Sequence, residues 1–256
     1  MISLFISIFR GVGKPGMERL SELKSPLHRA YNEKMRWVIT LLLFLPAALT
    51  SATDSDDPLM APVSLAELTA SADLVVLAQT RDTDYFMRRE IPVSGSAYLR
   101  VLIPYKGAES PAGLIEVYEK GLHGHECYFP NPTVFEEGRR YLLFLKKDPE
   151  NEKRYRGLPQ GCALEVLVDS DNRYALRYPV TGIDLSDPLG ELARAMKFSD
   201  GYAIVNDEAL LPVQREAMLA RGQIVPHESS ERRWLYTQGI SLTVIRKLMG
   251  QDRLSH

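Results

Sequence analysis

The sequence has only two cysteines, Cys127 and Cys162, and they do not form a C-x-x-C pair. This spacing gives no support to a redox dithiol or to a cysteine-rich metal site, although either remains the alternative to a structural bond. Two cysteines in an oxidising compartment favour a single disulfide. Such a bond closes a loop of about 35 residues and stabilises the fold by roughly 3–4 kcal/mol in the chain-entropy model.

Catalytic signatures are also missing from the sequence. It contains no G-x-S-x-G elbow, no H-E-x-x-H zinc motif, no P-loop and no dinucleotide fingerprint. Carboxylates are plentiful, but a sequence does not show which of them face each other across a glycosidase site. We therefore assign no catalytic residue and no cofactor, and we regard an enzyme as less favoured than a binding protein.

The chain also lacks an apolar run long enough to span a membrane, which takes about 20 residues. The longest run, residues 37–49, follows Arg36, contains Pro46 and ends before the small residues Thr50, Ser51 and Ala52. A basic start, a short apolar core and a small-residue exit predict a secretory signal peptide at residues 35–52, cut after Ala52. A periplasmic or secreted protein is therefore expected. An uncleaved membrane anchor is the alternative.

No block of basic charge is present. The chain has 31 basic and 33 acidic residues, and 7 basic and 3 acidic residues precede Thr53, so 24 and 30 remain in the expected mature chain. Nucleic acid and anionic membrane surfaces are poor partners for such a protein. Its expected partner is an unidentified protein or envelope component. Residues 1–34 are interpreted as a non-native or disordered N-terminal extension.

Short apolar runs punctuated by Gly, Pro and Asn predict β-strands in the first part of the mature chain. Six runs have this character: residues 74–78, 97–106, 114–118, 141–145, 164–168 and 175–178. In the second run, alternation predicts that Leu99, Val101, Ile103 and Tyr105 share one face. The fourth run has no polar break, so we expect a strand covered on one face by the barrel interior and on the other by C-terminal helices.

Helix signals flank these strands. Ser64 and Glu67 form an S-x-x-E capping box that predicts a short helix through Ala70. After about Ile183 the proline and glycine positions favour helices. They are expected at residues 189–196, 212–221 and 242–249.

Three segments of the β region carry motifs of a known kind. Residues 72–78 read ADLVVLA, residues 102–107 end in Lys-Gly, and Phe135, Gly138 and residues 141–145 fit F-x-x-G-x-x-Y-L-L-F-L. In this the chain resembles small secreted bacterial domains that look like the OB-type barrel of netrin-like modules and tissue inhibitors of metalloproteinases. The resemblance covers about residues 65–180. It implies a fold and does not carry over the inhibitors' zinc-binding N-terminal cysteine, because no cysteine precedes Cys127.

Two histidines form the cluster that most resembles a chemical site. His123 and His125 would share a face in a strand and could hold a transition metal, but two imidazoles need a third ligand, and a polar loop before Cys127 is the favoured interpretation.

The acidic segment at residues 169–172 resembles a calcium loop only at first sight. Arg173 and Tyr174 stand where an EF-hand needs an oxygen ligand and a glycine. We therefore expect a hairpin turn here.

Together these observations predict a mainly β fold: an OB-like antiparallel β-barrel at residues 53–182 with a helical C-terminal extension at residues 183–256. The expected role is a secreted or periplasmic binding or inhibitory module. The alternatives are a metal-assisted enzyme with a site near His123 and His125, and a membrane-anchored envelope assembly component.

Overall fold

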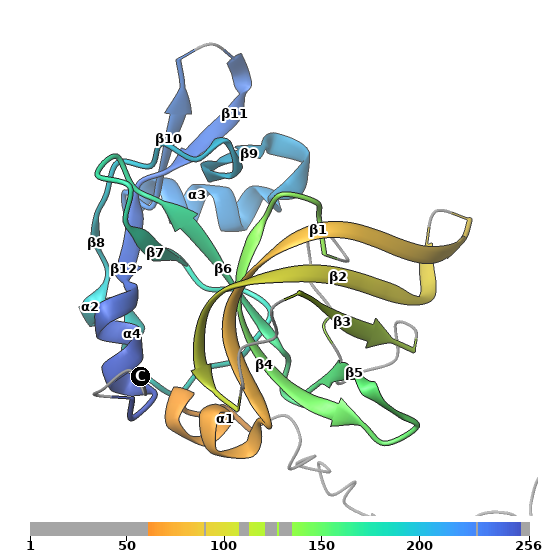
Figure 1. The fold of residues 1–256 in the computed structure, drawn as a ribbon. Coiled ribbons are helices and arrows are strands. Elements are labelled where there is room, and N and C mark those ends of the chain that lie inside the picture. Colours follow the sequence, from red (N-terminus) through yellow and green to blue (C-terminus); the bar gives the residue numbers. More distant parts are fainter. Residues whose placement is uncertain are drawn as a thin grey trace, which may run out of the picture. The chain divides into compact units, whose positions relative to one another are not determined.

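The computed structural model describes residues 61–89, 91–107, 113–120, 127, 135–228 and 230–251, and it is mainly β (Figure 1). The expected N-terminal extension, the expected signal peptide with its cleavage site, and the residues His123 and His125 lie outside the described residues.

A capped helix precedes the first strand, as predicted. Helix α1 (Leu65–Ser71) begins after Ser64, whose side chain accepts a hydrogen bond from the backbone N–H of Glu67 at 3.2 Å. The Glu67 carboxylate in turn accepts one from the backbone N–H of Ser64 at 2.8 Å. The reciprocal pair satisfies two N–H groups that the helix itself leaves unbonded.

Five strands form a closed ring. They are β1 (Leu74–Arg88), β2 (Ile91–Lys106), β3 (Leu114–Glu119), β4 (Arg140–Asp148) and β5 (Asn151–Gly157). The order is β1-β2-β3-β5-β4, and β4 pairs back with β1. All of these pairings are antiparallel except the one between β3 and β5, where Val117 lies opposite Tyr155.

Strand β4 is covered on both faces, as its unbroken apolar run predicts. Tyr141, Leu143 and Leu145 pack inside the ring with side chains of β1, β2 and β3 and with both cysteines. Leu142 and Phe144 point the other way and pack against helix α1 and helix α4 (Leu242–Leu248). The strand thus separates two apolar cores, one inside the ring and one outside it to which α1, α4 and further strands contribute.

Further strands extend the sheet beyond the ring. Strand β6 (Ala163–Val168) pairs with β4 and with β7 (Tyr174–Tyr178), and β7 pairs with β12 (Gln238–Ser241), which pairs with the short β8 (Arg194–Ala195). The β6–β7 turn confirms the predicted hairpin: the Asp169 carboxylate accepts hydrogen bonds from the backbone N–H groups of Asp171 and Arg173, each at 2.9 Å.

The helical character expected for residues 183–256 is wrong in part. Helices α2 (Leu189–Leu192), α3 (Pro212–Ala220) and α4 are present, and two short 3₁₀ helices, η2 (Gly201–Ala203) and η3 (Asp207–Ala209), join them. The same segment also supplies β8, β12 and a separate three-stranded sheet of β9 (Ile204–Asn206), β10 (Ile224–His227) and β11 (Ser230–Tyr236). These strands are short and mixed in polarity, and β9 lies far along the chain from its partner β11, so no local pattern marks them.

Candidate functional site

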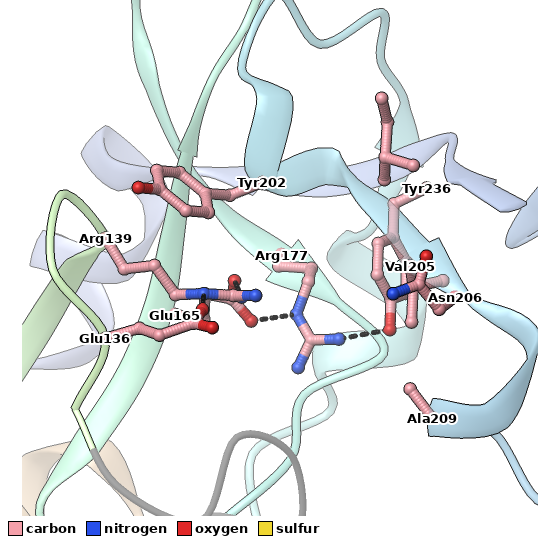
Figure 2. Close-up of a pocket in the computed structure, with 10 residues that line it drawn as sticks. Glu136, Arg139, Glu165, Arg177, Tyr202, Val205, Asn206, Ala209 and Tyr236 are labelled. Atoms are coloured by element: carbon pink, nitrogen blue, oxygen red, sulfur yellow. Dashed lines mark hydrogen bonds and ion pairs between the residues drawn. The ribbon is translucent and has the colours of Figure 1, made fainter. Parts of the chain in front are cut away.

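A polar pocket of about 140 Å³ lies where the large sheet meets the three-stranded sheet (Figure 2). One side is formed by β6, β7 and the turn before β4. The other side is formed by η2, β9, η3 and β11. The lining residues are Glu136, Arg139, Glu165, Arg177, Tyr202, Ile204, Val205, Asn206, Ala209 and Tyr236.

Glu165 holds two arginines in this pocket. One carboxylate oxygen forms an ion pair with Arg139, and the other lies 2.8 Å from Nε of Arg177. Arg139 also pairs with Glu136, so that two guanidinium groups and two carboxylates form one chain of contacts. Two positive and two negative side chains leave the pocket with a balanced charge.

Arg177 is the most buried member of this network, with 8% of its side chain exposed. Its guanidinium donates hydrogen bonds to the Tyr236 hydroxyl and, at 2.7 Å, to the Thr181 hydroxyl. Burial by itself lowers the pKa of this guanidinium, but the Glu165 carboxylate and Tyr236 together outweigh burial, and the pKa lies above its ordinary value. Arg177 therefore stays charged and serves as a fixed hydrogen-bond donor.

Tyr202 closes the pocket beside Arg139. The tyrosine hydroxyl donates a hydrogen bond to the backbone oxygen of Glu137 at 2.7 Å, and the Arg139 guanidinium lies 5.0 Å from the ring centroid. Gly138 permits this approach: its φ is 81°, and a Cβ there would come within 2.3 Å of the Tyr202 hydroxyl. A glycine is thus needed for both the turn and the contact.

Several polar atoms of the pocket remain available to a ligand. Within the part of the chain that the structure describes, Nη2 of Arg139 and the side-chain amide of Asn206 make no hydrogen bond. The Tyr236 oxygen accepts from Arg177, so its own proton is free to be donated. Arginine donors, an amide and carboxylate oxygens therefore face the same small volume.

The predicted disulfide is present. Cys127 and Cys162 are bonded with their Cα atoms 5.0 Å apart, and both are buried inside the ring. Because His123 and His125 lie outside the described residues, the structure says nothing of the metal site suggested for them. Among the residues that are described, no three His, Cys, Asp or Glu side chains lie close enough together to hold a metal ion.

Sequence reasoning missed the pocket, although one signal for it exists. Glu165 stands between Leu164 and Val166, and Arg177 follows Leu176, so that each places a charge inside an otherwise apolar strand. A charged side chain in such a position is rarely buried without a partner. What the sequence does not reveal is that the two charges face each other and that residues 202–236 cover them.

Within the described ranges, no helix has the length and apolar character needed to cross a membrane. Compared with known proteins, the chain matches no family model, no curated protein and no solved structure.

Proposed function

We propose that this chain is a non-catalytic binding module that works in the periplasm or outside the cell, built on an OB-like barrel similar to netrin-like modules. The five-stranded ring supports this fold, because an OB-fold is a partly open five-stranded barrel. The pocket beside the ring is its ligand site.

The pairing of every charged group in the pocket carries this proposal. Both carboxylates are in contact with arginines, and the arginines cannot lose their protons. A general acid or base must gain and release a proton during turnover, whereas groups fixed in ion pairs are suited to holding a ligand by hydrogen bonds. The geometry favours recognition over reaction.

The disulfide supports export. Disulfides form and persist in oxidising compartments and are rare in the cytosol. The expected signal peptide, cut after Ala52, would deliver the chain to such a compartment.

Export is tested by cell fractionation and N-terminal sequencing of the native protein. We expect a chain that begins at Thr53 and has no free thiol. A cytosolic chain with two titratable thiols would contradict export.

Ligand binding is tested with a variant that fills the pocket without removing a contact. Asn206 is exposed, and its side chain makes no hydrogen bond among the described residues, so Asn206→Trp should block the pocket and preserve the fold. Wild type, this variant and Glu216→Ala, an exposed change on α3, are incubated with the small-molecule fraction of the native extracytoplasmic extract and examined by native mass spectrometry.

We expect wild type and Glu216→Ala to retain the same small molecule and Asn206→Trp to lose it. Equal retention by all three proteins, or by none, would reject the pocket as the ligand site. Recovery of a chemically altered ligand would reject the non-catalytic role.

A second observation favours a protein partner. The β1–β2 hairpin extends past its neighbours, because β4 pairs with β1 only as far as Gln79 and β3 pairs with β2 only from Gly95 onward (Figure 1). Phe86 and Met87, near the hairpin end, are 67% and 48% exposed. Exposed large apolar side chains of this kind can serve as anchors at protein interfaces.

The partner role of the hairpin is tested by pull-down from the native envelope with wild type and with Phe86→Ser. A partner that binds wild type but not the serine variant supports the role, and an identical set of partners rejects it.

A further inference from the structure

We propose that the pocket between the two sheets binds an uncharged, hydroxyl-rich ring, a single monosaccharide unit. This proposal rests on the binding role proposed above and names the chemical class of the ligand.

The charge balance of the pocket selects against ions. Arg139 and Arg177 are matched by Glu136 and Glu165, and the nearby Arg140 is paired with Asp200 at 2.8 Å. An anion would meet two carboxylates together with the arginines, and a cation would meet two guanidinium groups. Every charged side chain of the pocket is already paired, so a charged ligand would lose its hydration and find no unpaired opposite charge in return, which costs free energy. A neutral ligand avoids this cost.

The hydrogen-bonding groups fit hydroxyls. A hydroxyl both donates and accepts, so adjacent hydroxyls can accept from Nη2 of Arg139 or the Asn206 amide and donate to a carboxylate oxygen. Arg177 is held by Glu165 and Tyr236 (Figure 2) and also by Thr181, and these three contacts fix the direction of its remaining N–H groups. Fixed donors beside fixed acceptors suit a ring whose hydroxyls are themselves rigidly placed.

The volume of the pocket limits how many sugar units of a ligand it can bury. A water molecule needs about 10–15 Å³ of this kind of volume, so 140 Å³ accommodates on the order of ten water-sized positions. This matches one sugar ring and is too small for an oligosaccharide buried along its length. A terminal or single unit is therefore the expected occupant.

The test compares sugar rings that differ in charge. Binding of glucose, galactose, mannose and N-acetylglucosamine, all neutral, is measured by saturation-transfer and chemical-shift NMR on the full chain. Glucuronate and glucosamine serve as the negatively and positively charged counterparts of glucose. We expect wild type to bind at least one neutral sugar and to bind the matching charged rings more weakly.

Two variants locate the effect in the pocket. Asn206→Ala removes an exposed donor and acceptor, and we expect binding of the neutral sugar to weaken about three- to tenfold. Glu136→Gln removes one negative charge, and we expect the glucuronate-to-glucose affinity ratio to rise at least threefold. Glu216→Ala should leave all affinities unchanged, because that side chain lies on α3 away from the pocket lining.

Failure to bind any neutral sugar would overturn the sugar assignment, and so would tighter binding of glucuronate than of glucose by wild type. If wild type nevertheless retained another molecule from the native extract, and lost it in Asn206→Trp, the binding role would stand and only the ligand class would fall. If neither sugars nor the extract supplied a ligand, both proposals would be rejected together.

Discussion

Arg177 of β7 and Tyr236 of β11 join the large sheet to the three-stranded sheet by a hydrogen bond and a cation–π contact. The guanidinium donates a hydrogen bond to the tyrosine hydroxyl, and its central carbon lies 4.6 Å from the centroid of the tyrosine ring. Glu165, on the neighbouring strand β6, fixes Arg177 from the opposite side. A few buried polar groups thus shape the pocket, and substituting them should change the free energy of unfolding measurably.

Glu165 is predicted to be more important for stability than Glu136, although both contact Arg139. The Glu165 side chain is 11% exposed and neutralises two arginines, whereas Glu136 is 48% exposed. Glu165→Gln should lower the free energy of unfolding by about 3–5 kcal/mol, since it leaves buried charge uncompensated. Glu136→Gln, the matched control, should lower it by less than about 1 kcal/mol. Urea denaturation of both variants measures the difference, and equal effects would show that Glu165 is not the centre of the network.

Leu143 tests the core inside the strand ring. Its side chain is fully buried in β4, so Leu143→Ala should cost about 2–5 kcal/mol of unfolding free energy, the range for a buried leucine. Leu114→Ala at the start of β3 is the control, because Leu114 is 55% exposed. An unchanged denaturation midpoint for Leu143→Ala would mean that β4 is peripheral.

The disulfide should contribute substantially to stability. Cys127 and Cys162 are separated by 35 residues, for which the chain-entropy model gives about 4 kcal/mol. The double variant Cys127→Ala, Cys162→Ala should unfold at a correspondingly lower urea concentration than the oxidised wild type. Wild type treated with a reductant should approach the variant, and insensitivity of the wild-type midpoint to reductant would contradict the prediction.

Asp148 should govern part of the acid sensitivity. Burial raises the pKa of this carboxyl, but the backbone N–H of Glu150 and the Arg154 and Arg156 guanidinium groups outweigh burial and hold the pKa below its usual range. A lowered folded-state pKa stabilises the fold above the unfolded value of about 4, and this contribution is lost as the pH falls through the folded value. Asp148→Asn should therefore be less stable at pH 7 and lose less stability on acidification.

Urea midpoints measured between about pH 7 and pH 2.5 test this expectation. Asp184→Asn, at an exposed position, is the control and should follow the wild-type curve. An acid limb of unchanged slope in Asp148→Asn would show that other carboxylates are responsible.

The sequence predicts the apolar strands, the capping box at Ser64 and the turn at Asp169, because each depends on neighbours within a few residues. It does not predict the polar strand β5. Its sequence, NEKRYRG, has no apolar alternation, and it is a strand because β4 and β3 hydrogen-bond to it on either side. The segment thus forms a strand because of the strands that pair with it, and its own residues contribute less.

The single face predicted for Leu99, Val101, Ile103 and Tyr105 was wrong for the same reason. The register between β1 and β2 shifts between Leu77 and Ala78, so that Leu99 and Val101 pack inside the ring while Ile103 and Tyr105 pack toward the helices. A β-bulge reverses the alternation after it, and here it belongs to the pairing of β2 with β1.

The sequence by itself determined that this protein has a mainly β core, where its central strands lie and which cysteines are available to bond. Those features follow from local periodicity and composition. Only the tertiary structure determined where the pocket lies and which residues line it. Glu165, Arg177 and Tyr236 come from three strands, and their positions in the sequence do not predict that they are in contact. Buried charges pair with groups that are close in space rather than in sequence, and it is the packing of the three-stranded sheet against the large sheet that brings these groups together.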